Sequence, residues 1–327
     1  MRGISRKVRE ARGEFKPMNP GRTAGVGAYR GRFAPSPTGP LHFGSLLAAF
    51  GSWLRARRAG GTWLVRVEDL DPPREVAGAA EAQLRTLAAF GLHSDEPVLR
   101  QSERGAAYQA ALDRLLARGD AFACHCSRSA LAANGGVHRG CVGGLREDPA
   151  IRFRVPADAR VAFDDAIQGQ VVQNVATEVG DFVLRRADGP WAYQLAVVVD
   201  DAAQGITEVV RGADLLDSTP RQILLQRALG VPTPAYAHLP LVLDAQGRKL
   251  SKSLAALPVD PDAPLPALRA AWTALGQPAQ ALARAGSVDA ALAAAIRAFD
   301  PARIPRGPRL PDAGDAALRP AVDDTTG

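Results

Sequence analysis

The stretch from residue 32 to residue 45, Arg-Phe-Ala-Pro-Ser-Pro-Thr-Gly-Pro-Leu-His-Phe-Gly-Ser, constrains the fold more than any other part of the chain. Residues 29–34 have the composition of a short strand, and the prolines and glycine that follow exclude regular structure. Apolar residues then recur with helical spacing from residue 43, which predicts a helix to about residue 58. A strand, a stiff loop and a helix in this order point unpaired backbone N–H groups at an anion. His42 and Ser45 would add side-chain donors at the same place.

Two short motifs resemble the signatures of one enzyme family. His42-Phe43-Gly44-Ser45 resembles the first signature of class I aminoacyl-tRNA synthetases, His-Ile-Gly-His, in the variant of glutamyl-type enzymes, with serine replacing the second histidine. Residues 248–253, Arg-Lys-Leu-Ser-Lys-Ser, resemble the second signature, Lys-Met-Ser-Lys-Ser, and follow the first in the expected order. The resemblance covers about residues 30–255 and agrees with the short glutamyl-type relatives, the glutamyl-Q tRNA(Asp) synthetase family.

The remaining pattern predicts an α/β fold. Residues 62–67 read as a buried strand, helices are expected at about 74–90 and 104–118, and a strand at 206–210 precedes a helix that ends near residue 229. Strands and helices that alternate in this way indicate a parallel, doubly wound sheet. The resemblance implies the Rossmann-like fold of class I synthetases, with an inserted small α/β domain that carries a zinc module.

Six segments are expected along the chain. In order, they are a basic, disordered extension (1–28), the first half of the nucleotide-binding domain (29–120), the inserted domain with the zinc module (121–190), the second half of the nucleotide-binding domain (191–255), a helical C-terminal segment (256–304) and a disordered tail (305–327). Residues 191–201 should return to the main sheet, and two helices are expected at about 263–275 and 288–299. Because the sequence ends at Gly327, soon after Ser253, we expect no anticodon-binding domain like that of a full glutamyl-tRNA synthetase.

The positive charge is concentrated at the start of the chain. The formal net charge is +6, and the segment 1–30 holds eight lysines and arginines against two glutamates. This extension could bind RNA, or translation could start at Met18; we favour disorder or a misplaced start over a function. No apolar run is long enough to span a membrane, no secretory signal is evident, and three cysteines do not make a disulfide framework. We therefore expect a cytoplasmic protein.

The cysteines point to a metal site. All three lie in the short segment from Cys124 to Cys141, together with two histidines. Thiolates with an imidazole suit tetrahedral zinc, and four protein ligands would make the site structural. The resembled family has Cys-x-Cys, then Gly-Gly followed by a tyrosine and a last cysteine. When the two patterns are aligned on their Gly-Gly pair, the resemblance assigns one zinc per chain to Cys124, Cys126, His138 and Cys141. His125 is the competing ligand.

The resemblance also implies an activity, formation of glutamyl-adenylate from L-glutamate and ATP. The catalytic residues would be His42 and Lys252, with Mg²⁺ bound between the phosphates of ATP. ATP would be bound by His42, Gly44, Ser45, Lys249 and Lys252. Glutamate would be bound by Arg32, Phe33, Ala34, Pro35, Ser36, Glu68, Tyr193 and Arg211. The residue types agree with these roles, because arginine grips a carboxylate bidentately and Glu68 can hold an ammonium group.

Three functions are compatible with this pattern. The first is transfer of glutamate to queuosine in the anticodon stem-loop of tRNA(Asp) by a monomeric enzyme. The second is a truncated glutamyl-tRNA synthetase that charges a tRNA 3′ end, and the third is a non-catalytic RNA-binding paralogue. Intact Arg32, Glu68, Arg211 and Lys252 argue against the third. The His-Phe-Gly-Ser variant and the short C-terminal part favour the first over the second.

Overall fold

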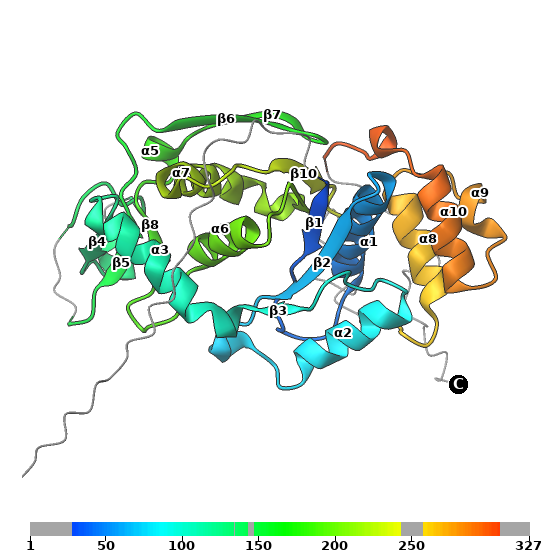
Figure 1. The fold of residues 1–327 in the computed structure, drawn as a ribbon. Helices are drawn as coiled ribbons and strands as arrows, with labels where there is room; N and C mark the ends of the chain where they lie inside the picture. Colours follow the sequence, from blue (N-terminus) through cyan, green and yellow to red (C-terminus); the bar gives the residue numbers. More distant parts are fainter. Residues whose placement is uncertain (1–27, 134, 143–146, 243–257, 308–327) are drawn as a thin grey trace, which may run out of the picture.

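The computed structural model describes residues 28–133, 135–142, 147–242 and 258–307. Two groups of strands form its centre (Figure 1). A parallel group, in the order β1–β2–β3, consists of Arg30–Phe33, Thr62–Val67 and Leu99–Arg100. A second group, in the order β7–β6–β10–β9, consists of Gly169–Asn174, Arg160–Asp165, Ala235–Leu239 and Glu208–Gly212. The backbone N–H of Thr207 donates to the carbonyl of Arg30 at 2.9 Å, which places the two groups side by side at β1 and β9.

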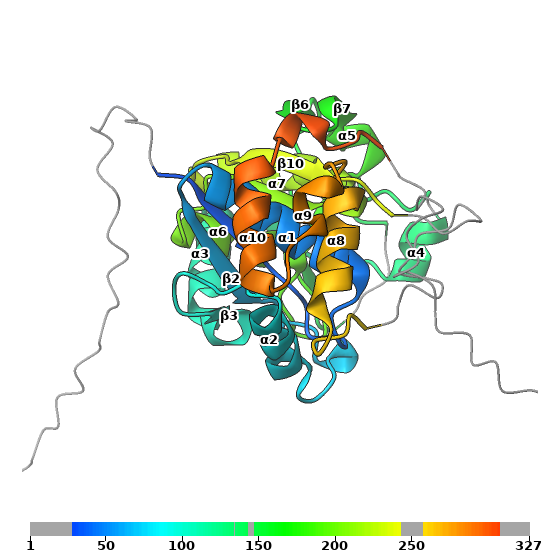
Figure 2. The same ribbon diagram turned by 90° about the vertical axis from the view of Figure 1, so that its right-hand side faces the viewer.

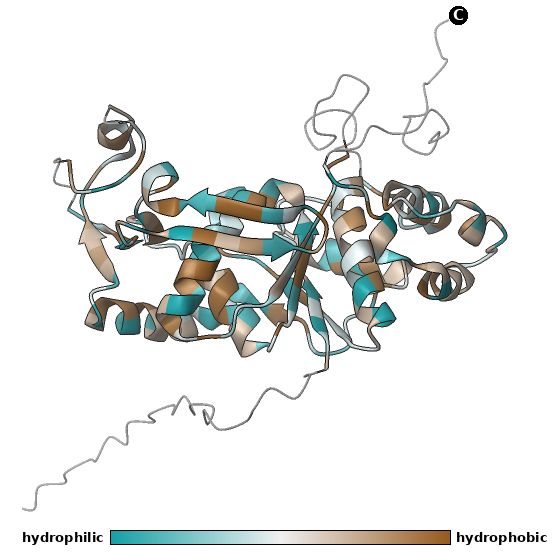
Figure 3. Cartoon of the chain, turned by 90° about the horizontal axis from the view of Figure 1, so that it is seen from above, coloured by the Kyte–Doolittle hydropathy of each residue, from teal (hydrophilic) through white to brown (hydrophobic). Residues whose placement is uncertain are grey.

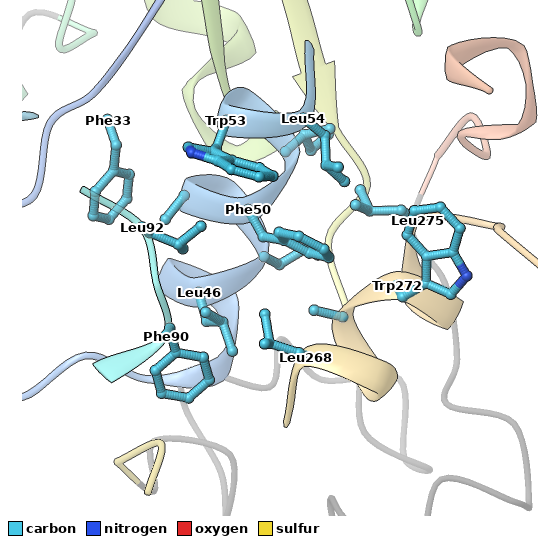
Figure 4. Close-up of a cluster of buried hydrophobic side chains, with 14 of the residues drawn as sticks. Phe33, Leu46, Phe50, Trp53, Leu54, Phe90, Leu92, Leu268, Trp272 and Leu275 are labelled. Carbon is cyan, nitrogen blue, oxygen red and sulfur yellow. The ribbon is translucent and has the colours of Figure 1, made fainter. Parts of the chain in front are cut away.

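One face of the strands is covered by α1 (Phe43–Arg58), which begins directly after the loop that follows β1. The C-terminal helices α8 (Pro264–Ala274) and α10 (Val288–Ala298) pack against α1 from outside and lie in front of it in Figure 2. Phe50 of α1 shares a buried apolar cluster with Leu268 and Trp272 (Figure 4). The C-terminal helices therefore shield the apolar stripe of α1 that the strands leave uncovered.

The other face is covered by three further helices, α3 (Gly105–Ala117), α6 (Tyr193–Ala203) and α7 (Thr219–Leu229). They form a second buried cluster with the strands, in which Leu112, Leu195 and Leu225 pack with Val209 of β9. Helix α2 (Ala79–Ala89) connects β2 to β3, and α9 (Gln280–Ala283) lies between α8 and α10 in sequence. Helices on both faces of parallel strands confirm the prediction of a doubly wound α/β fold.

The sequence analysis predicts that residues 191–201 return to the main sheet. This prediction is wrong, because residues 193–201 form most of helix α6. Leu195, Ala196, Val197 and Val198 are all buried, because α6 is covered by other elements on several sides. Such a helix has a continuous apolar run, which sequence periodicity cannot distinguish from a buried strand. The strands that follow in the sheet are β9 and β10 instead.

A small antiparallel sheet lies at one end of the molecule, on the left in Figure 1. It contains β4 (Ala121–Cys124), β5 (Ala150–Phe153) and β8 (Phe182–Arg185), and the short helices α4 (Arg128–Ala133) and α5 (Val175–Glu178) belong to the same part of the chain. The hairpin β6–β7, seen from above in Figure 3, does not join this sheet. Strand β6 pairs in parallel with β10, with Asp165 opposite Tyr236, so residues within the predicted insertion extend the central strands.

Some predictions fall outside the described residues. They concern the basic extension up to residue 27, the second signature with Lys249 and Lys252, and the tail from residue 308. Helices α8 and α10 agree with the two C-terminal helices expected from the sequence. Within the ranges that the structure describes, no helix is long and apolar enough to cross a membrane.

Candidate active site and metal centre

A cavity of about 890 Å³ lies at the carboxyl ends of β1, β2, β9 and β10. This is the edge at which open α/β sheets bind their ligands. The residues predicted to bind glutamate or ATP, as far as the structure describes them, all line this cavity: Arg32, Phe33, Ala34, Pro35, Ser36, His42, Gly44, Ser45, Glu68, Tyr193 and Arg211. Segments that are far apart in the sequence are thus brought together around one space. The predicted Lys249 and Lys252 lie outside the described residues.

His42 caps the N-terminus of α1 at the cavity. The backbone N–H of Ser45 donates to His42 Nδ1 at 3.2 Å, and Ser45 Oγ lies 3.2 Å from His42 Nε2. Glycine at position 44 leaves room for the ring, because a Cβ there would lie 3.1 Å from His42 Cε1. The first turn of α1 contains no acidic side chain. The helix N-terminus therefore presents a positive potential to the cavity and is suited to an anion such as phosphate.

A buried network of alternating charges connects two of the residues that are predicted to bind glutamate, Arg32 and Glu68. Arg32 donates from Nε and Nη2 to the two carboxylate oxygens of Asp201, at 3.0 and 3.2 Å. Arg66 donates from Nη1 to Asp201 at 2.7 Å and from Nη2 to Glu68 at 3.2 Å. This chain of contacts, Arg32–Asp201–Arg66–Glu68, therefore fixes the Arg32 guanidinium and the Glu68 carboxylate relative to each other.

The network changes the acid–base properties of its carboxylates. Burial raises the pKa of Glu68 above its ordinary value, and Arg66 and Arg32 offset this only in part. Burial would also raise the pKa of Asp201, but Arg32 and Arg66 outweigh it and hold that pKa below its usual range. Asp201 is therefore a fixed negative charge that orients Arg32. The Nε edge of Arg32 is occupied by these two bonds.

The sequence reasoning missed Arg66 and Asp201. A signal for them exists, because Arg66 lies in the largely apolar strand β2 and Asp201 follows a run of apolar residues in helix α6. A buried charge is almost always paired with an opposite one. Arg66 is fully buried and Asp201 is 6% exposed, as that rule requires of a pair in the interior.

Arg211, near the end of β9, is held by neighbours on several sides. Its Nη1 donates to the hydroxyl of Tyr193 at 3.0 Å, and its Nη2 donates to Thr219 Oγ1 at 2.8 Å. Its Nη2 also lies 3.3 Å from the carbonyl of Leu215. Since the Tyr193 hydroxyl oxygen accepts from Arg211, its own O–H can donate to a ligand. Arg211 and Tyr193 thus offer adjacent donors to an anionic group in the cavity.

The four predicted metal ligands also meet. The ligand atoms of Cys124, Cys126, His138 and Cys141 all lie within 4.8 Å of one another. His138 Nε2 lies 3.3 Å from Cys124 Sγ and 3.8 Å from Cys126 Sγ. Three sulfurs and one imidazole nitrogen at this separation fit a tetrahedral structural zinc site. His125, the competing ligand, is not a member of this cluster.

Asp181 orients the histidine of the cluster. Its carboxylate lies 2.8 Å from His138 Nδ1, the ring nitrogen that does not face the thiols. Metal-binding histidines usually have such a partner, which fixes the tautomer and turns the other nitrogen toward the metal. Gly180 allows this approach, because a Cβ there would collide with the carbonyl of His138. The sequence reasoning missed Asp181, which is far in the sequence from the four residues of the cluster.

Comparisons with known proteins agree with this geometry. Residues 28–140 and 144–262 match the family described as tRNA synthetases class I (E and Q), catalytic domain. A glutamyl-Q tRNA(Asp) synthetase of Xanthomonas axonopodis pv. citri is 68% identical over 278 residues, which cover 85% of this chain and 93% of the relative. Another of that name, from Burkholderia cenocepacia J2315, is 58% identical over 296 residues, covering 86% of this chain and 97% of the relative.

Solved structures give the same picture. The crystal structure of a glutamate tRNA ligase from Elizabethkingia meningosepticum, in complex with its amino acid, superimposes with a TM-score of 0.72 at 28% identity. The match covers 88% of this chain and 68% of that one. The likeness confirms the class I catalytic fold predicted from the two signatures.

Proposed function

The chain belongs to the class I glutamyl- and glutaminyl-tRNA synthetase family and, within it, to the glutamyl-Q tRNA(Asp) synthetases, and on this premise we propose how it acts. It activates L-glutamate with ATP and transfers the glutamate to the queuosine base in the anticodon of tRNA(Asp). The observation that carries this function is the high identity to relatives of that name over nearly their whole length. The cavity that collects Arg32, Glu68 and Arg211 supports glutamate as the substrate.

In the first step, the α-carboxylate of glutamate attacks the α-phosphate of ATP, and pyrophosphate leaves. Arg32 and Arg211 hold the two carboxylates of the substrate, and Glu68 holds its ammonium group. The walls near them are formed by Phe33, Ala34, Pro35, Ser36 and Tyr193. These roles require that Glu68 be ionised, which Arg66 favours from 3.2 Å away. The step depends on positioning and charge neutralisation more than on proton transfer.

The phosphates of ATP bind at the N-terminus of α1, beside His42, Gly44 and Ser45. Mg²⁺ would accompany the nucleotide and neutralise part of the phosphate charge. Lys249 and Lys252 supply positive charge for the departing pyrophosphate. The described residues on either side of that segment support this role. Val242 lines the cavity, and Pro258 forms a β-bridge with His42.

In the second step, a hydroxyl of the queuosine cyclopentene ring attacks the carbonyl carbon of the adenylate, and AMP leaves. The acceptor is a single anticodon stem-loop, whose unstacked bases can enter a pocket as those of other RNA loops do. We propose that the enzyme acts as a monomer. Cys124, Cys126, His138 and Cys141 would hold one zinc ion, which would stabilise the small antiparallel sheet and take no part in the chemistry.

Activation of glutamate should occur without RNA, because membership in the short glutamyl-Q group implies it, whereas a full-length glutamyl-tRNA synthetase would not be expected to show it. We expect the purified protein to catalyse ATP–pyrophosphate exchange that depends on L-glutamate. Glutamine should support at most a small fraction of the rate, since its amide carries no charge for Arg32 or Arg211. Exchange that begins only when tRNA is added would contradict the proposal and would favour a glutamyl-tRNA synthetase that charges the 3′ end.

A further inference from the structure

A histidine that has no role in the mechanism above lies behind Arg211. His238 is in β10, opposite Arg211 of the neighbouring strand β9, and is fully buried. Its Nε2 lies 3.1 Å from Arg211 Nε, and its Nδ1 lies 2.6 Å from a carboxylate oxygen of Asp165. Asp165 is the last residue of β6 and is also buried. The three side chains form a line that leads from the hairpin β6–β7 to the cavity.

The donors and acceptors of this line are fixed by chemistry. Arginine Nε–H can only donate, so His238 Nε2 must be an unprotonated acceptor. The hydroxyl of Thr219, 3.3 Å from the same nitrogen, can donate to it as well. The other nitrogen, Nδ1, then carries the proton and donates it to Asp165. The remaining carboxylate oxygen of Asp165 accepts from the backbone N–H groups of Ile167 and Gln168, at 3.0 and 2.8 Å. Only the Nδ1–H tautomer of a neutral His238 satisfies all of these bonds.

The electrostatics agree with a neutral histidine beside a charged aspartate. Burial lowers the pKa of His238, and the positive charge of Arg211 lowers it further, against the effect of Asp165. Burial would raise the pKa of Asp165, but its hydrogen bonds with His238 and with the backbone outweigh it and lower that pKa. His238 therefore remains neutral next to Arg211 and does not repel it.

We propose that Asp165 and His238 are positioning residues, which hold the Arg211 guanidinium at the angle needed to receive a carboxylate of glutamate. The proposal rests on the function proposed above for Arg211. The Asp165–His238 pair fixes the Nε edge of the guanidinium, while Thr219 and Tyr193 contact its other nitrogens. Because Asp165 comes from β6, a segment that the sequence places in the inserted domain contributes to the glutamate site.

The test replaces Asp165 with asparagine. An asparagine amide can donate to His238 Nδ1, which would favour the Nε2–H tautomer of the histidine. The Nε2–H group of His238 would then face the Nε–H group of Arg211, and two donors cannot form a hydrogen bond with each other. We expect the dissociation constant and the KM for glutamate to rise by about tenfold or more, with kcat for exchange nearly unchanged, because the interaction contributes to binding before and during reaction alike. Asp164→Asn is the matched control, since Asp164 is the exposed neighbour on the same strand.

Two further measurements separate positioning from a general loss of stability. The ¹⁵N NMR spectrum of the ring should show His238 protonated at Nδ1 in the wild type and at Nε2 in the D165N variant. The signal is assigned by its absence from His238→Gln. That variant keeps an amide oxygen that can accept from Arg211, so it should bind glutamate more tightly than His238→Ala.

Several outcomes would overturn the proposal. They are an Nε2–H tautomer in the wild type, glutamate binding by D165N within about twofold of the D164N control, or equal losses in H238Q and H238A. Glutamate affinity is measured by calorimetry as well as by exchange. A wild-type protein that binds glutamate but catalyses no exchange would refute the proposed function, while the affinities of the variants would still decide the role of Asp165 and His238.

Discussion

Replacing Asp201 with alanine is expected to lower the free energy of unfolding by about 3–5 kcal/mol, because removing one partner leaves uncompensated buried charge. Asp201 accepts from Arg32 through both of its carboxylate oxygens, and it also accepts from Arg66 at 2.7 Å. Without it, these two buried guanidinium groups would lose the carboxylate that they share. We also expect weaker glutamate binding, because Arg32 loses the group that fixes its orientation. Urea unfolding with linear extrapolation measures the first effect, and calorimetry the second.

Asp188→Ala provides the matched control. Asp188 pairs with Arg186 at 2.6 Å, but its side chain is 56% exposed. An exposed pair contributes about 0–1 kcal/mol, so this variant should be almost as stable as the wild type. If Asp201→Ala lost no more stability than Asp188→Ala, the buried network would not have the role assigned to it here.

Loss of the metal is the second large effect that we expect. The protein should contain about one zinc per chain, with three sulfur ligands and one nitrogen ligand in its X-ray absorption spectrum. His138→Ala should abolish stable binding, because it removes a ligand of the cluster. Asp181→Asn should weaken binding by about 10–100-fold, as is typical when the partner of a metal-binding histidine is lost.

His125→Ala is the control for these variants, because His125 is adjacent to two of the cysteines but is not in the cluster. It should retain its zinc. Zinc content is measured by mass spectrometry after dialysis against a chelator of graded concentration. Zinc that survives in His138→Ala and is lost from His125→Ala would show that the fourth ligand was assigned wrongly. A metal-free wild type of unchanged stability would refute the metal centre altogether.

Residues that belong to a local motif could be predicted from the sequence. Strand β1 and the loop before α1 contain Arg32, Ser36 and His42 in one short stretch, and the prolines and the helix that follows determine its shape. The metal ligands are similarly close in sequence, although the family pattern was needed to choose between His125 and His138. Arg32, Ser36 and His42 all line the cavity. The four predicted metal ligands lie together in a separate cluster.

Residues that support the site from a distance could not be predicted in this way. Asp201 lies far from Arg66 in the sequence, as Asp165 does from His238, yet both pairs are in direct contact. Their meeting depends on which strands are neighbours, and the pairing of β6 with β10 has no signal in local periodicity. The misassignment of residues 191–201 has a related cause, because burial on several sides removes the amphipathic pattern by which a helix is recognised.

The most direct test of the function is to find where the glutamate is attached. Labelled glutamate, ATP and the enzyme are incubated with tRNA(Asp) from which the 3′-terminal adenosine has been removed, and the anticodon stem-loop is then isolated by nuclease digestion. We predict that the label is found in the stem-loop when the tRNA comes from cells that make queuosine, and that it is absent when they cannot. Labelling that requires the 3′ adenosine and is indifferent to queuosine would contradict the function proposed here.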